Sequence, residues 1–208
     1  MFKRLFSGLL LSLVPLFAQN PIAISKNDLP SIEKKYTQSA ILRLNDYNEQ
    51  YAVWQNFSKQ DQLVRINFYI NGMLGQYDAY TYNDEDYWAT PKEFLLRGRG
   101  DCEDYVSLKF FTYLSLAFSE KELFYGVVKD LYSNSYHMVL LYASEKELLV
   151  LDNLSSRILP LKQRVDLKFL YAFNKQGIYK LNEENILSKS QKNEAKFRKL
   201  LSKIKRGE

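Results

Sequence analysis

The sequence predicts an α+β fold in which a central helix packs on a mainly antiparallel sheet, and three observations support this. A segment from Cys102 to about Phe118 is apolar on most sides of a helix, and helices of this kind are usually buried. From Leu123 onward, the apolar pattern changes to short β-rich runs separated by polar turns. Helices followed by consecutive strands are typical of α+β domains.

Two clear helix starts precede the buried helix. Ser58, with Asp61 three residues later, resembles a capping box, and an apolar stripe at helical spacing follows it. Thr90 and Pro91 combine an N-cap residue with proline at the first helical position. Residues 31–57 also have a helix-favouring composition, although without a clear start or end.

The strands are expected at residues 123–129, 136–143, 148–153, 169–173 and 178–181. Side chains alternate between the two faces of a strand, so the length of a hairpin turn decides which residues share a face. An even-numbered turn at 144–147 places His137 and Asp152 on one face. They are then directly opposite, or diagonal neighbours if the turn is centred on Glu145 and Lys146.

The start of the chain differs from the rest. Lys3 and Arg4 precede an almost wholly apolar run, 5–17, and Ala18 offers a small residue for cleavage. The run is shorter than the roughly 20 residues that a membrane-spanning helix needs. Residues 1–18 are therefore predicted to be an export signal peptide, with an uncleaved membrane anchor as the alternative.

Residues 19–182 are predicted to form a single domain, and residues 183–208 a basic C-terminal tail. Apolar residues are interleaved with the lysines and arginines of this tail, as in an amphipathic basic helix. We expect a solvated, partly frayed segment, with contact to a membrane surface as the alternative. The net charge of +5, which falls when Lys3 and Arg4 are removed with the signal, is too modest to indicate nucleic-acid binding.

The chain has one cysteine and one histidine. A lone cysteine in an exported protein can form no internal disulfide and is a liability unless it is buried or used. Asp101 has the N-cap position of the buried helix, which places Cys102 in its first turn, where the helix dipole lowers a thiol pKa. With His137 as base and Asp152 as orienting group, this predicts a Cys–His–Asp triad. The alternatives are an inert core cysteine and a structural histidine.

Acidic residues surround Cys102 and disfavour its thiolate, so a protonated His137 or a bound cation must offset them. The acidic residues around the loop and the helix start supply enough oxygen atoms for calcium: Asp84, Glu85, Asp86, Asp101, Glu103 and Asp104. The spacing of these residues, taken alone, is more typical of a solvated acidic face, which is the alternative interpretation. Zinc is disfavoured because the only cysteine and the only histidine are needed elsewhere.

Four segments occur in order along the chain, at 86–91, 98–105, 137–140 and 150–154. Together they resemble the bacterial transglutaminase-like cysteine proteinases, the LapG-type periplasmic adhesin proteases, over about 66–179. The resemblance implies a papain- or transglutaminase-like core and a triad of Cys102, His137 and Asp152. It also implies a calcium site at Asp101 and Glu103, with Asp86 as a further ligand. The acidic insertion before Asp86 and the basic tail do not match the family pattern.

The same resemblance implies a periplasmic endopeptidase that cleaves a large outer-membrane-tethered adhesin near its N-terminus, at a paired-alanine site. An inner-membrane cyclic-di-GMP receptor is the implied regulator, and adhesin release promotes biofilm dispersal. Two rival functions stay open. The same triad serves acyl transfer to an amine, as in a transglutaminase, and a chain with a dead site could act as a calcium-binding adaptor.

Overall fold

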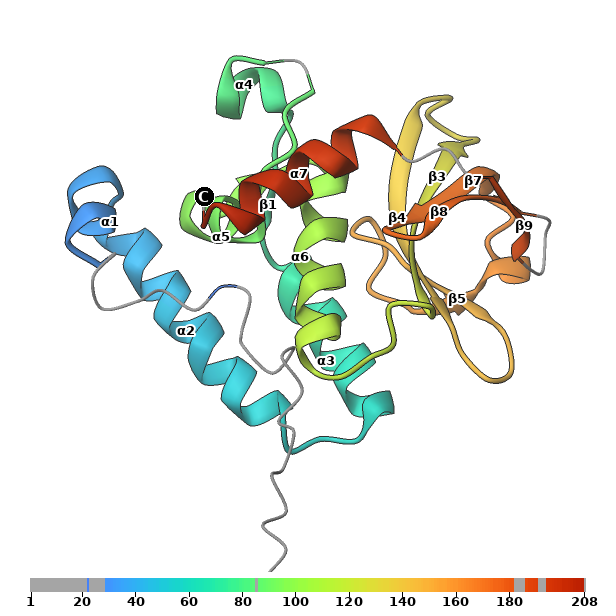
Figure 1. Ribbon diagram of the computed structural model, residues 1–208, viewed down its shortest axis with the longest axis horizontal. Helices are drawn as coiled ribbons and strands as arrows, with labels where there is room; N and C mark the ends of the chain where they lie inside the picture. Colours follow the sequence, from blue (N-terminus) through green and yellow to red (C-terminus); the bar gives the residue numbers. More distant parts are fainter. Residues whose placement is uncertain (1–21, 23–28, 85, 182–185, 191–193, 208) are drawn as a thin grey trace, which may run out of the picture.

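A layer of helices covers one face of a seven-stranded sheet in the computed structural model (Figure 1). The structure describes residues 22, 29–84, 86–181, 186–190 and 194–207, so the predicted export signal, 1–18, lies outside the described residues. None of the helices in the described ranges is both long and apolar enough to cross a membrane.

Five helices precede the central one: α1 (Leu29–Lys35), α2 (Gln38–Trp54), α3 (Lys59–Asn71), α4 (Asp78–Tyr82) and α5 (Pro91–Arg97). Both predicted helix starts are confirmed. Ser58 Oγ accepts a hydrogen bond from the Asp61 backbone N–H at 3.2 Å and so begins α3. Thr90 forms a complete capping box with Glu93 at the start of α5.

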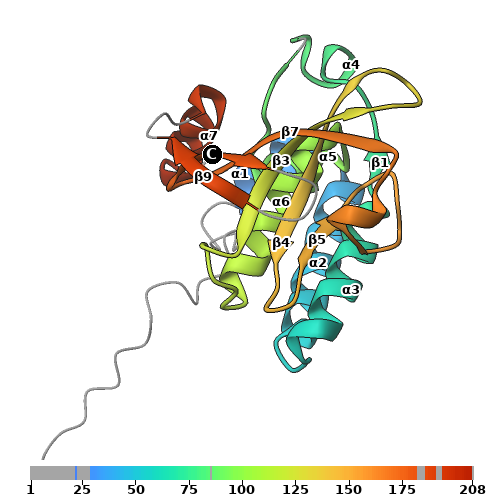
Figure 2. The same ribbon diagram turned by 90° about the vertical axis from the view of Figure 1, so that its right-hand side faces the viewer.

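The central helix, α6 (Cys102–Ser115), is buried over most of its length. Every residue from 103 to 113 is buried, which confirms the prediction made from its apolar circumference. One side of α6 packs on the sheet at β4 (Tyr136–Ala143), and other sides contact α3 and α5. In Figure 2 the strands cross in front of this helix. The two ends of the helix reach the surface: Cys102 in the first turn, and Leu114 and Ser115 in the last turn, are partly exposed.

The other six strands of the sheet are β3 (Leu123–Asp130), β5 (Leu148–Leu151), β6 (Leu159–Pro160), β7 (Leu167–Asn174), β8 (Gly177–Leu181) and β9 (Ile186–Ser190). The strand order is β6-β5-β4-β3-β7-β8-β9, and every pairing is antiparallel. Leu123 and Tyr125 face the helices, whereas Phe124 and Val128 belong to a second apolar cluster. The sheet is thus covered on both faces at its centre.

A short parallel pair, β1 (Leu74–Gly75) with β2 (Arg99–Gly100), joins the end of α3 to the approach of α6. Two-residue strands carry no readable periodicity, and the sequence did not predict them. At Gly100 a Cβ atom would lie 2.2 Å from Asp104 Oδ2, so only glycine fits there. The pair fixes where the backbone enters the first turn of α6.

The C-terminal helix, α7 (Ala195–Lys205), packs on the core. Phe197 is 2% exposed, and its ring lies 4.7 Å from that of Tyr125 and 5.5 Å from that of Phe173, between centroids. The interpretation of this segment as a solvated, frayed tail is therefore wrong for 195–205. Its apolar residues meet an aromatic surface that only the folded chain creates, and the many lysines and arginines obscured this contact in the sequence.

We predict that Phe197→Ala lowers the free energy of unfolding by about 3–5 kcal/mol, because the truncation leaves a cavity among packed rings. Chemical denaturation of the purified protein measures this loss. Lys199→Ala, at an exposed position on the same helix, is the control and should change stability by less than about 0.5 kcal/mol. Equal effects of the two changes would contradict the docking of α7.

Candidate active site

Elements from distant parts of the chain converge on a cavity of about 830 Å³. Cys102 lies in the first turn of α6, and His137 lies near the start of β4. β1 and the beginning of the C-terminal helix also line the cavity, through Gly75 and Lys196. The cavity therefore contains both the predicted nucleophile and the predicted base.

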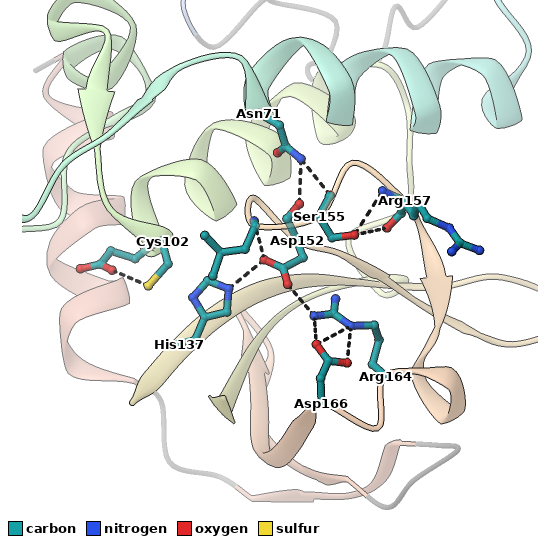
Figure 3. Close-up of polar contacts among 10 residues, drawn as sticks. Asn71, Cys102, His137, Asp152, Ser155, Arg157, Arg164 and Asp166 are labelled. Carbon is teal, nitrogen blue, oxygen red and sulfur yellow. Dashed lines mark hydrogen bonds and ion pairs between the residues drawn. The ribbon is translucent and has the colours of Figure 1, made fainter. Parts of the chain in front are cut away.

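The turn between β4 and β5 sets the geometry of the histidine. Leu140 pairs with Leu151, so the turn is centred on residues 145 and 146, and His137 and Asp152 are diagonal neighbours on one face. His137 Nε2 lies 2.8 Å from Asp152 Oδ1, with both side chains buried. This is the diagonal alternative of the sequence prediction. Figure 3 shows the other ring nitrogen of His137 on the side that faces Cys102.

Asp152 is buried but fully paired. Arg164 Nη2 donates to Asp152 Oδ2 at 2.8 Å, and the Leu154 backbone N–H donates to Oδ1 at 2.9 Å. Burial alone would raise the pKa of this carboxyl, but the contacts with His137, Leu154 and Arg164 outweigh it and hold the pKa well below its usual range. Arg164 is in turn fixed by Asp166, with Nη2 and Oδ2 2.6 Å apart. Asp152 therefore stays ionised beside the imidazole.

Two supports of Asp152 were missed in the sequence. Arg164 follows a single 3₁₀ turn, η1 (Leu161–Gln163), and its distance along the chain gives no sign of the contact. Asn71, at the end of α3, donates through Nδ2 to the Asp152 backbone oxygen at 2.8 Å and to the Ser155 backbone oxygen at 3.1 Å (Figure 3). No local pattern could have revealed either residue, because both contacts depend on tertiary packing.

The thiol of Cys102 points toward acidic groups. Its Sγ donates a hydrogen bond to Glu103 Oε2 at 3.3 Å. Burial raises the thiol pKa well above its usual value, and the negative charges of Glu103 and Asp101 add to the rise, while the Met138 backbone opposes it. The expectation that the neighbours of Cys102 work against its thiolate therefore agrees with the structure.

A carboxylate cluster lies behind this turn of α6. Asp78, Asp101 and Asp104 each offer an oxygen atom, and these three atoms lie within 4.8 Å of one another. Asp78 Oδ2 accepts from the Tyr87 backbone N–H at 2.6 Å, and Asp104 Oδ1 accepts from the Ala89 backbone N–H at 2.9 Å. Asp78 Oδ1, Asp101 Oδ1 and Asp104 Oδ2 are buried and have no hydrogen-bond partner in the described part of the chain.

The protonation of the cluster reflects this lack of partners. Burial and the charge of Asp101 raise the pKa of Asp78 to about 7. Burial and the neighbouring Glu103 raise the pKa of Asp101 to about 8. The pKa of Asp104 is also raised, chiefly by burial. Three carboxyl groups that converge, have unpartnered buried oxygen atoms and resist ionisation without a counter-charge are the ligand set of a hard cation, so these residues fit a calcium ion.

The structure distributes the three predicted metal residues differently. Asp101 belongs to the cluster. Glu103 is directed toward the thiol. Asp86 forms an ion pair with Lys196 and accepts a hydrogen bond from Trp88 Nε1 at 3.2 Å. Asp78 was missed, because the pairing of β1 with β2 that brings it to α6 has no signature in the sequence.

Comparisons with known proteins agree with this geometry. The family model described as bacterial transglutaminase-like cysteine proteinase BTLCP matches residues 38–177. Calcium-bound Legionella pneumophila LapG is similar with a TM-score of 0.73 and 29% sequence identity, over 87% of this chain and 99% of that chain. EGTA-treated Legionella pneumophila LapG is similar with a TM-score of 0.70 and 28% identity, over 87% and 98% of the two chains. No curated protein matches the chain.

A buried lysine lies on α6 below the site. Lys109 is 0% exposed, and its Nζ has no hydrogen-bond partner among the residues that the structure describes. Burial lowers its pKa to about 7, although the charge of Asp152 opposes the change. The lysine therefore titrates near neutral pH inside the fold, whereas in the unfolded chain it titrates near its ordinary value.

We predict that Lys109→Met increases stability most at or below pH 7, where the buried ammonium is charged. Between about pH 7 and 10 only the unfolded chain holds this proton, so wild-type stability rises relative to the variant by up to about 1.4 kcal/mol per pH unit. Denaturation at several pH values measures the difference. Lys121→Met, at an exposed position, is the control. A difference between Lys109→Met and wild type that does not change with pH would contradict the prediction.

Proposed function

The chain belongs to the bacterial transglutaminase-like cysteine proteinases, and on that basis we propose that Cys102, His137 and Asp152 form its catalytic triad. The observation that carries the proposal is the 2.8 Å contact between His137 Nε2 and Asp152 Oδ1, in the cavity that Cys102 also lines. A nucleophile, a base and a group that orients the base are the requirements of covalent catalysis by a thiol.

In the proposed reaction, Asp152 holds the proton on His137 Nε2, which leaves Nδ1 free to accept the thiol proton. The thiolate of Cys102 attacks the peptide carbonyl carbon and forms a thioacyl-enzyme, while His137 returns the proton to the leaving amine. A water molecule, deprotonated by His137, then hydrolyses the thioester, and His137 returns that proton to the sulfur of Cys102 as the thiolate leaves. The Cys102 backbone N–H, at the start of α6, is directed toward the developing oxyanion.

We further propose that Asp78, Asp101 and Asp104 hold a calcium ion. The support is their unpartnered buried oxygen atoms and the similarity to a LapG that is calcium-bound. A bound cation supplies positive charge beside carboxylates that otherwise raise the thiol pKa. Glu103 and Asp86 lie close to this cluster in the sequence, and we predict that they act as additional calcium ligands.

The proposed substrate is a large adhesin held at the outer membrane, cleaved near its N-terminus at a paired-alanine site. Such cleavage releases the adhesin and promotes biofilm dispersal. The proposed location is the periplasm, reached through the export signal at 1–18, and the proposed regulator is an inner-membrane cyclic-di-GMP receptor. These proposals rest on the family resemblance and on the composition of the first residues.

The first experiment concerns the nucleophile. Purified protein lacking 1–18, with calcium, should cleave an adhesin segment that contains the paired alanines. Cys102→Ala should lower kcat/KM by at least about 10⁴-fold, because the thioacyl-enzyme cannot form. Lys199→Ala is the control and should cleave like wild type. Undiminished cleavage by the Cys102→Ala protein would rule out the mechanism, and an inert thiol toward alkylation at neutral pH would favour a calcium-binding adaptor.

A second experiment concerns the ion. Removal of calcium with a chelator should abolish cleavage, and added calcium should restore it. Calcium at about 100 times its Kd should also stabilise the folded chain by about 2.7 kcal/mol, measured by denaturation. Asp104→Asn should lose most of this stabilisation, because it removes a charged ligand, whereas the exposed Glu145→Gln should keep it. Equal stabilisation of the two variants would place the ion elsewhere.

A further inference from the structure

We propose that β1 binds the substrate as an added strand, with the main-chain N–H and C=O of Gly75 paired to an extended peptide that crosses the active-site cavity. The inference rests on the proposed proteolytic function and specifies how the peptide is held. Addition of a strand to an exposed sheet edge is a common mode of peptide recognition, in which main-chain hydrogen bonds provide much of the affinity.

The pairing of β1 with β2 leaves one edge of β1 open. The Leu74 backbone N–H donates to the Gly98 oxygen at 3.1 Å, and the Gln76 backbone N–H donates to the Gly100 oxygen at 2.8 Å. Because main-chain groups alternate in direction along a strand, those of Gly75 point away from β2. Among the described residues, β2 is the only strand that pairs with β1. The N–H and C=O of Gly75 are thus available to a ligand.

Gly75 has no structural reason to be glycine. A Cβ atom at this position would meet nothing within 4 Å. Gly98, by contrast, has a φ of 70°, and a Cβ at Gly100 would lie 2.2 Å from Asp104 Oδ2. Gly75 lines the cavity and pairs with Gly100, which lies two residues before Cys102. Glycine inside a strand is typical of a place where a ligand or another backbone approaches closely, and here that place lies in the cavity beside Cys102.

Two exposed aromatic rings line the same cavity as this edge. Tyr77, two residues after Gly75, is 76% exposed, and Tyr136, directly before His137, is 77% exposed. Both line the cavity. Large exposed rings around a cleft are typical of a surface that a partner covers. Side chains of a strand paired to Gly75 could pack against these rings.

This mode of binding restricts the substrate. The cleaved segment must be extended and not already paired in a sheet, since its main-chain groups bond to Gly75. The substrate residue that faces Gly75 must also carry an N–H, which excludes proline. An unfolded linker of a larger protein meets both conditions, whereas a segment inside a folded domain does not.

Binding to the Cys102→Ala protein tests the inference without need of catalysis. The probe is a fluorescein-labelled peptide with a central Ala-Ala pair, measured by fluorescence anisotropy. Gly75→Pro should raise the Kd by about tenfold or more, because the proline ring removes the N–H that points to the peptide and occupies its place, while the bonds from Leu74 and Gln76 to β2 remain. Ala79→Val, at an exposed position on α4 outside the cavity lining, should bind like the parent. Equal melting temperatures establish that the variants remain folded.

Peptides N-methylated at one amide at a time provide a second measurement. One methyl group should weaken binding to the parent about tenfold and add little to the effect of Gly75→Pro, since both changes break the same hydrogen-bonded pair of residues. If Gly75→Pro is unstable, the N-methyl series on the parent decides alone. Equal affinities throughout would overturn the inference. Failure of the intact protein to cleave this bound peptide would instead count against the proposed function, with the binding results still decisive for Gly75.

Discussion

The structure depends on the burial of negative charge around the first turn of α6. Asp78 and Asp104 are almost fully buried, and Asp101, which directly precedes Cys102, belongs to the same cluster. Carboxyl groups in such surroundings either keep a proton or acquire a cation. The pKa of Asp101 is about 8 in the folded protein, which is above its value in the unfolded chain. The folded protein therefore binds a proton here that it loses as pH rises, and the free energy of unfolding falls as pH rises to about 8. The cation-free fold is therefore least stable where these groups are ionised.

Asp152 shows the opposite outcome under similar burial. Its two carboxylate oxygens accept hydrogen bonds from Arg164 and the Leu154 backbone and contact His137, so its pKa falls rather than rises. The two sets of carboxyl groups differ in their hydrogen-bond partners. A buried carboxylate is tolerated when donors surround its oxygen atoms, as they do at Asp152. One part of the site thus carries a permanent carboxylate that orients the imidazole. The other part carries the carboxyl groups of Asp78, Asp101 and Asp104, which need a bound cation to be fully ionised at neutral pH.

Local signals explain which features the sequence predicted. The caps at Ser58 and Thr90 and the apolar circumference of α6 are properties of adjacent residues, and the structure confirms them. The shared face of His137 and Asp152 follows from strand periodicity and turn length alone. Contacts between distant segments have no such signature. Arg164, Asn71, Asp78 and the β1–β2 pair all depend on tertiary packing, so sequence analysis could not identify them.

The C-terminal helix connects the aromatic core to the acidic cluster. Lys203 Nζ donates to the Trp88 backbone oxygen at 3.0 Å, and Lys196 pairs with Asp86. The segment 86–89 lies between these anchors and supplies the backbone N–H groups of Tyr87 and Ala89 that hold Asp78 and Asp104.

The positions of the carboxylates, and with them the charge beside Cys102, therefore depend on a helix that lies outside the matched family region, 38–177. Packing at the end of the chain thus contributes to the electrostatics around Cys102.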